Sequence, residues 1–175
     1  MTDLKKVYHT LLDRYGPQGW WPIVDRTREP LACSYVRENT GKTKTAGEVF
    51  EICIGAILTQ NTNWSNAEKA LISLISSGSL SPGILSRADS KVIAGFIASS
   101  GYYNQKARKI QVFSAFFLTH PKPDRTLLLA QWGLGPETVD DMLLYAYDQP
   151  VFVIDLYTRR LFSRLGLCPE KIRYD

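Results

Sequence analysis

GLGPETVDDMLLYAYDQPVFVIDLYTRRLFSRL, residues 133–165, joins a tight glycine turn to one carboxylate in an apolar run about twenty residues further on. The Gly-Leu-Gly turn at 133–135 can link a short helix over 127–132 to a second helix that begins at Pro136. Glycines allow a close approach of the backbone, and the free N–H groups at a helix start attract anions. The turn therefore predicts a helix-hairpin-helix over about 125–147 that holds a DNA phosphate without reading bases, although an ordinary interhelix loop with a C-cap glycine is an alternative.

The carboxylate of this stretch is Asp155. Residues 150–154 (PVFVI) deliver it to the start of a further helix, which carries Arg159, Arg160 and Arg164. An aspartate there can be functional, or it can be only an N-cap that satisfies free amides and gains from the helix dipole. Both interpretations predict a helix that starts directly after Asp155.

Hydrophobic periodicity along the chain predicts an all-α protein. A segment from Gly16 to about Gly47 is expected to be irregular, and only 151–154 alternates enough to suggest a strand. On the second hairpin helix, Asp140 and Asp141 are expected to face water. The expected helices lie near 3–15, 48–58, 64–76, 89–99, 104–118, 125–131, 136–147 and 156–165.

Composition limits the class of protein. A chain of 175 residues with 45% hydrophobic residues suits one globular unit or two small lobes, and a net charge of +4 favours a polyanionic partner. The apolar runs are too short to span a bilayer, so we expect no membrane association and a cytoplasmic, nucleoid-associated location. Cys33, Cys53 and Cys168 are too far apart in sequence to indicate a zinc site or a disulfide framework.

Several motifs resemble the endonuclease III superfamily of DNA glycosylases, and the resemblance covers roughly residues 45–168. They are the hairpin, residues 50–62 (FEICIGAILTQNT), residues 150–155 (PVFVID) and residues 158–166 (TRRLFSRLG). Two further motifs look most like a subgroup related to a bacterial 3-methyladenine DNA glycosylase: residues 15–22 (YGPQGWWP) and 101–107 (GYYNQKA).

The resemblance implies a two-lobed helical fold with a cleft. Residues 1–47 would contribute to the second lobe and the base pocket, and residues 48–175 would form the helical core with a catalytic Asp155. Chains of this family usually continue through further helices, so we expect the present sequence to be a C-terminally truncated form. Many relatives hold an iron–sulfur cluster on four cysteines after this region; that pattern is missing here, so we expect neither a cluster nor any other cofactor.

The resemblance also assigns site residues. Trp20, Trp21, Pro22 and Phe50 correspond to positions that line the base pocket, where electron-rich rings favour a cationic purine; some of them could instead pack in the core. Gln60 and Asn61 match the loop that fills the gap left by a flipped nucleotide, or else they form a polar loop before the next helix. The expected phosphate contacts are Gly133, Gly135, Thr138 and Lys106.

The chemistry follows from Asp155. Cleavage of a base–deoxyribose bond builds positive charge on the sugar, which a carboxylate can stabilise. Bifunctional members carry a lysine two residues after the second hairpin glycine, where this chain has Glu137. We therefore predict a monofunctional glycosylase. Its expected partner is duplex DNA with a damaged base, such as an alkylated purine, and we expect it to act as a monomer. The alternatives are a lyase that uses another lysine, such as Lys106, and a non-catalytic DNA-binding module.

Overall fold

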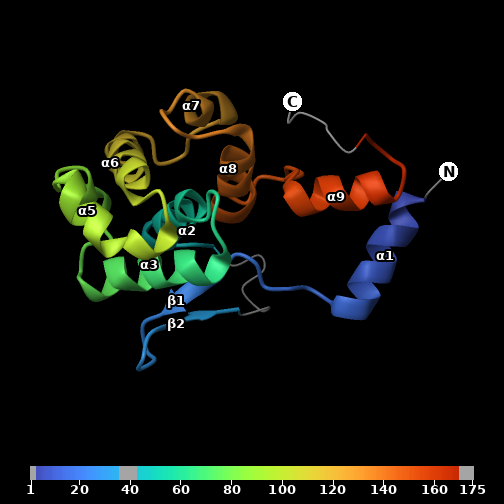
Figure 1. The fold of residues 1–175 in the computed structure, drawn as a ribbon, viewed down its shortest axis with the longest axis horizontal. Helices are drawn as coiled ribbons and strands as arrows, with labels where there is room; N and C mark the ends of the chain where they lie inside the picture. The colour runs from blue at the N-terminus through green and yellow to red at the C-terminus, as the bar shows by residue number, and fades with distance from the viewer. Residues whose placement is uncertain (1–2, 36–42, 170–175) are drawn as a thin grey trace.

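The computed structural model describes residues 3–35 and 43–169 of the chain (Figure 1). Its elements are helical apart from one two-stranded sheet, which confirms the all-α prediction for the bulk of the chain. In chain order they are α1 (Leu4–Tyr15), β1 (Ile23–Asp25), β2 (Ala32–Ser34), α2 (Ala46–Leu58), α3 (Trp64–Ser76), α4 (Pro82–Leu85), α5 (Ser90–Phe96), the 3₁₀ turn η2 (Ala98–Ser100), α6 (Tyr103–Thr119), α7 (Arg125–Leu129), α8 (Pro136–Asp141), the π-helical turn η3 (Met142–Ala146) and α9 (Leu156–Arg164).

Helix α2 lies at the centre of the fold. Its start is fixed by a capping box, in which Thr45 and Glu48 each bond the other's backbone N–H. Every residue from Phe50 to Leu58 is buried, as expected for a helix that is apolar on all sides and surrounded by other elements. Helices α3, α6 and α8 and the turn η3 pack against it. We call residues 46–146, from α2 through η3, the core lobe.

The sheet was not predicted, because its three-residue strands are too short to show an alternating pattern. Strands β1 and β2 pair antiparallel, with Val24 opposite Cys33. Side chains from the core lobe hold both strands: the carboxylate of Glu51 accepts the N–H of Val24 at 2.6 Å, and that of Glu68 accepts the N–H of Cys33 at 3.1 Å. Arg26 of the connecting turn donates to Glu51 at 2.7 Å. These contacts fix the chain that follows Trp20 and Trp21 against α2 and α3.

The hairpin forms between α7 and α8. Gly133 has a φ of +84°, a conformation that L side chains rarely adopt, and Gly135 is the N-cap of α8. The predicted helix over 136–147 changes into a π-helical turn after Asp141, and the N–H of Tyr147 donates to the carbonyl of Met142. The chain over 151–154 forms no strand, contrary to the weak alternation there.

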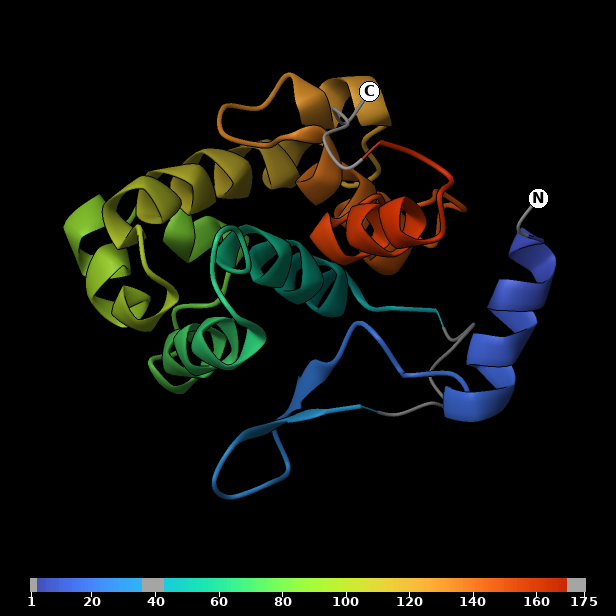
Figure 2. The same ribbon diagram turned by 45° about the vertical axis from the view of Figure 1, so that its right-hand side comes forward.

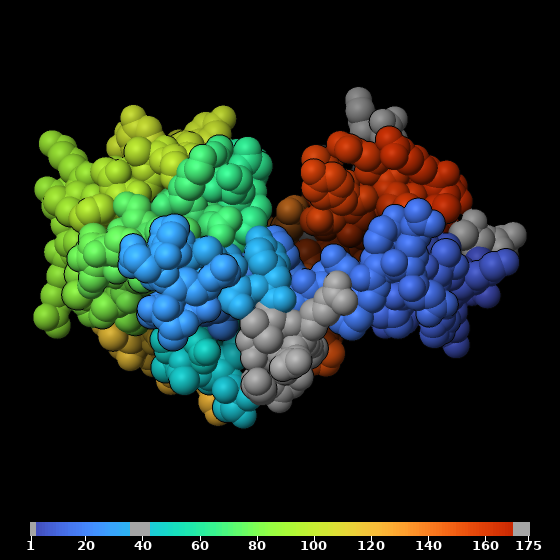
Figure 3. All heavy atoms as spheres, turned by 90° about the horizontal axis from the view of Figure 1, so that it is seen from below, coloured from blue at the N-terminus to red at the C-terminus, as the bar shows by residue number. Residues whose placement is uncertain are grey.

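Helix α1 stands apart from the core lobe at one side of the molecule (Figures 1 and 2). Helix α9 lies on the same side next to α8, to which its Arg159 forms an ion pair, and neither α1 nor α9 contains a buried residue. Asp3 caps α1 and Asp155 caps α9. The surface is notched between the core lobe and α9 when the molecule is seen from below (Figure 3). This arrangement agrees in outline with two lobes and a cleft, while the boundary near residue 47 stays a prediction.

Candidate active site

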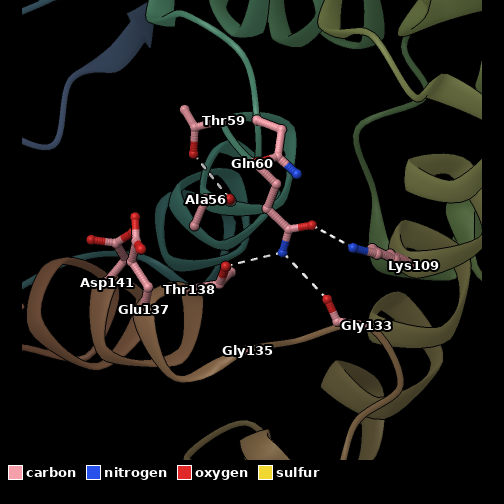
Figure 4. A pocket seen from close by; sticks show the side chains of 10 residues that line it. Ala56, Thr59, Gln60, Lys109, Gly133, Gly135, Glu137, Thr138 and Asp141 are labelled. Carbon is pink, nitrogen blue, oxygen red and sulfur yellow. Dashed lines mark hydrogen bonds between the residues drawn. The ribbon is translucent and has the colours of Figure 1, made fainter. Parts of the chain in front are cut away.

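A pocket of about 280 Å³ opens where the end of α2 and the following loop face the hairpin and α8 (Figure 4). One of its ends carries the carboxyl groups of Glu137 and Asp141, which lie next to each other one helical turn apart on α8, and its other end carries the ammonium group of Lys109 from α6. The remaining lining comes from Ala56, Thr59, Gln60, Asn61, Gly133, Gly135 and Thr138.

A third carboxyl group, that of Asp155, acts on this acidic end. It is the N-cap of α9 and accepts the N–H of Thr158 at 2.7 Å, so the alternative role as a cap is realised in the structure. Its charge also helps to raise the pKa of both Glu137 and Asp141, which shows that the three carboxyl groups share one electrostatic environment. Structural capping and a role in the pocket are therefore compatible.

The three carboxyl groups differ in the partners that stabilise their negative charge. Glu137 has an ion-pair partner in Arg159, at 3.4 Å, and its pKa is raised mainly by desolvation. Asp141 has no hydrogen bond or ion pair within the described part of the chain, and desolvation followed by the charges of Glu137, Asp155 and Asp140 raises its pKa to about 7. Both Asp140 and Asp141 were predicted to face water, and neither does so. Asp140 is buried and pairs with Arg125 at 2.7 Å, and Asp141 lines the pocket.

A hydrogen-bonded clamp joins the hairpin to the loop after α2. The side-chain amide of Gln60 donates to the carbonyl of Gly133 at 3.3 Å and to the hydroxyl of Thr138 at 3.0 Å, and its oxygen accepts from Lys109 at 2.6 Å (Figure 4). The stem of Lys109 crosses the hairpin so closely that a Cβ at Gly133 would lie 2.7 Å from its Cε. Glycine is thus required at 133 for its conformation and for this contact.

An aromatic cluster lies beside the acidic end. The ring of Trp21 packs 5.6 Å from that of Tyr145, whose pKa is raised by desolvation and then by the charges of Asp141 and Asp155. The indole nitrogen of Trp21 would lie 2.9 Å from a Cβ at position 55, so Gly55 allows the ring to approach α2. The rings of the cluster are Trp20, Trp21, Tyr35, Trp64 and Tyr145.

Comparison with known proteins places these features in a family. Residues 54–175 match the HhH-GPD superfamily of base excision DNA repair proteins. The chain belongs to this superfamily. It is 36% identical to a candidate DNA repair glycosylase of Methanocaldococcus jannaschii, over 97% of this chain and 73% of that protein. It is 32% identical to endonuclease III of Sulfolobus acidocaldarius, over 77% of this chain and 62% of that protein, so part of each relative has no counterpart here.

Two solved structures of DNA glycosylases are similar to this chain. The structure of the 3-methyladenine DNA glycosylase MagIII of H. pylori bound to 1,N6-ethenoadenine is 28% identical, with a TM-score of 0.65 over 74% of this chain and 69% of that one. A trapped covalent complex of endonuclease III with DNA superposes over 99% of this chain and 74% of that one, with a TM-score of 0.73 at 17% identity, and shows the shared fold. The predicted endonuclease III-like family, its helical fold and the class of DNA glycosylase are confirmed.

Three of the predicted site residues occupy other places in this HhH-GPD fold. Lys106 is not open to phosphate: it is 2% exposed, and its ammonium donates to the carbonyls of Leu58 and Ser100, both at 2.7 Å. Phe50 is 1% exposed and packs in the core against other phenylalanines, so it lines no open pocket. The side chain of Gln60 is hydrogen-bonded to Gly133, Thr138 and Lys109, and its insertion into DNA would require these bonds to break.

Most of the other predicted positions remain open to their proposed roles. Asn61 is exposed at the tip of the loop, in a left-handed conformation with a φ of +52°. Trp20 is 41% exposed, whereas Pro22 is buried, which does not favour its predicted place in the wall of the base pocket. No side chain caps α8 at Gly135, which leaves the start of this helix free for an anion. Gly133 and Thr138 line the pocket, although the hydroxyl of Thr138 is occupied by Gln60.

Sequence reasoning missed Asp141, Lys109, Trp64 and Tyr145 as parts of the site. Tyr145 lies four residues after Asp141, a spacing that puts two side chains on one helical face and could have linked the rings to the carboxyl groups. Within residues 3–35 and 43–169, no cluster of His, Cys, Asp and Glu side chains could hold a metal ion, and no helix is both long and apolar enough for a membrane span. The absence of an iron–sulfur cluster stays a prediction.

Proposed function

We propose that this chain is a monofunctional DNA glycosylase, which hydrolyses the N-glycosidic bond of an alkylated purine flipped out of duplex DNA. The observation that carries the proposal is the acidic end of the pocket. Helix α8 carries Glu137 close to Asp155, and Glu137 forms an ion pair with Arg159. A carboxyl group at this position, unlike an amine, cannot attack the sugar carbon to form a Schiff base. Water is then the nucleophile, and an intact abasic strand is the product.

Asp155 has the chemistry for this reaction. As the base leaves, positive charge develops on the deoxyribose, and the carboxylate of Asp155 stabilises that charge and orients the attacking water. The N–H of Thr158 holds the carboxylate in place, because one oxygen accepts this hydrogen bond at 2.7 Å. An alkylated purine already carries a positive charge and needs no proton to leave, so one carboxylate is sufficient for this substrate class.

Recognition of such a purine is assigned to the aromatic cluster. Trp20 offers an exposed ring face, and Trp21 and Tyr145 connect the cluster to the acidic end of the pocket. Stacking between such rings and a cationic purine is favourable. The similarity to MagIII, a 3-methyladenine DNA glycosylase, supports the same substrate class. Asn61 would fill the gap left in the duplex, and the hairpin backbone would hold a phosphate.

The test is release of free bases from methylated duplex DNA by the wild-type chain and by Asp155→Asn. We expect the wild type to release 3-methyladenine and to leave strands that break only after alkali. Asp155→Asn should retain DNA affinity and lose at least about 10³-fold in rate. If the wild type binds duplex DNA and releases no base from any methylated substrate, the chain acts as a DNA-binding module and the proposal fails.

One observation favours strand cleavage as a second candidate. Lys109 lies in the pocket, and burial lowers its pKa, so a larger fraction of this amine is unprotonated and nucleophilic. Borohydride trapping on abasic DNA separates the two functions. A covalent adduct that is lost in Lys109→Gln would establish a lyase, whereas no adduct with the wild type would exclude it. Lys106→Gln is the matched control, because Lys106 is buried on the same helix.

A further inference from the structure

We propose that Asp141 is a second functional carboxyl group of this pocket, which holds a proton beside Asp155 and donates it to a neutral damaged base as that base leaves. The inference rests on the proposed glycosylase function and extends its substrate class from cationic purines to uncharged ones. It is based on the pocket, on the contacts of three carboxyl groups and on the chemistry of the leaving group.

The first step concerns how charge is distributed at the acidic end. Glu137 and Asp141 line the pocket, and Asp155 is close enough for its charge to raise the pKa of both, so the three neighbouring carboxyl groups do not all ionise together. Negative charge on Glu137 is stabilised by Arg159, and negative charge on Asp155 by the N–H of Thr158 and the positive end of the α9 dipole. Asp141 has neither kind of partner in the described residues, so the proton resides there.

The surroundings of Asp141 support this assignment. Desolvation and the neighbouring negative charges raise the pKa of Asp141 to about 7, so the acid form is present under neutral conditions. Lys109 is the cation of the same pocket, but it lies at the opposite end and is bonded to Gln60. DNA phosphates entering the cleft would further favour the protonated form. The charged or titratable groups around Asp141 are Glu137 and Asp140 from α8, Tyr145 from η3, Asp155 and Arg159 from α9, and Lys109 from α6.

The reaction balances with this one proton. When the C1′–N bond of a neutral purine breaks, its electron pair goes to the base, and the proton of Asp141 moves to a ring nitrogen so that the base leaves uncharged. Asp155 stabilises the positive sugar. Water then adds to C1′, and the proton that it releases restores the acid form of Asp141. A cationic purine leaves as a neutral molecule without this proton, so its excision does not depend on Asp141.

The experiment compares two substrates and four proteins. The substrates are methylated duplex DNA, in which 3-methyladenine is cationic as long as it is bonded to the deoxyribose, and a duplex with a single neutral 1,N6-ethenoadenine. We expect Asp141→Asn to lower the ratio of the ethenoadenine rate to the 3-methyladenine rate by at least about 10²-fold at pH 7, relative to the wild type. For the wild type, the ethenoadenine rate should fall as the pH rises through about 7, because the acid form is lost.

Glu137→Gln is the matched variant, since it removes a neighbouring charge and keeps Asp141. It should shift the fall in the ethenoadenine rate to lower pH, a change that a merely structural role of Asp141 would not produce. Asp155→Asn should abolish release of both bases.

The outcomes separate the two proposals. If the wild type releases neither base, the glycosylase function itself fails, and the inference about Asp141 fails with it. If the wild type releases 3-methyladenine alone, or if Asp141→Asn slows both substrates equally or slows neither, the inference about Asp141 is overturned while the glycosylase function stands.

Discussion

The core lobe and the two outer helices, α1 and α9, are built on different principles. The buried apolar side chains of the described residues all lie between Pro22 and Ala146, whereas neither outer helix contains a buried residue. The outer helices expose apolar side chains instead, including Leu11 and Tyr157. Most of the pocket belongs to the core lobe, but Asp155 stands at the start of α9. Under the proposed function, the catalytic carboxylate of Asp155 thus lies outside the lobe that stabilises the fold, and mutations can separate stability from catalysis.

The largest expected contrast comes from equal truncations in the two regions. Leu74→Ala removes a fully buried side chain of α3 and should lower the free energy of unfolding by about 3 kcal/mol. Leu11→Ala removes a side chain of α1 that is 44% exposed and should change it by less than about 0.5 kcal/mol. Urea denaturation measures both. Equal losses would show that α1 is packed as firmly as the core lobe.

Two lysines of α6 allow a comparison of stability and DNA binding within the core lobe. Lys106→Met leaves two buried carbonyl groups without their charged donor and should lower the free energy of unfolding by about 2 kcal/mol. Lys109→Met loses one hydrogen bond to Gln60 and should lower it by less than about 1 kcal/mol. In duplex binding at several salt concentrations, only the Lys109 variant should show a smaller salt dependence. A smaller salt dependence in the Lys106 variant alone would instead indicate that Lys106 contacts DNA.

The smallest effect concerns the boundary between the two regions, where the charge of Asp155 acts on Asp141. The pKa of Asp141 is raised above its ordinary value of 3.8, so the stability that its proton supplies is full below about pH 4 and is lost as the pH rises to about 7. Between pH 5 and pH 8, Asp141→Asn should therefore gain about 1 kcal/mol relative to the wild type, since partial hydration weakens the full effect. Thermal or urea unfolding at both pH values tests this, and a constant difference would contradict it.

Local signals explain why some of this structure could be predicted. Helix α3 has the predicted limits, because Asn63 caps its start and Gly78, with a φ of +68°, follows its end. The start of α9 after Asp155 and the Gly-Leu-Gly turn before α8 were predicted for the same reason, because capping and turn signals lie in neighbouring residues.

Contacts between distant parts of the sequence explain what was missed. The β1–β2 hairpin depends on Glu51 and Glu68, which lie 27 and 35 residues from their partners. Lys106 was assigned to phosphate because it is a lysine in a basic segment, yet it shares an apolar stripe at helical spacing with Ile110 and Phe113, and that pattern indicates burial. Asp141 could not be singled out, since its pocket is assembled from α2 and the loop after it, from α6, and from the hairpin and α8.

The amide of Gln60 makes the loop that carries Asn61 and the hairpin a single mechanical unit. If the hairpin holds the DNA backbone, as proposed, a displacement of the hairpin is passed on through the hydrogen bonds from Gln60 to Gly133 and Thr138, and Gln60 directly precedes Asn61. The phosphate bound by the hairpin and the base pair at which Asn61 inserts would then be held at a fixed distance from each other along the DNA, and the protein would set this distance.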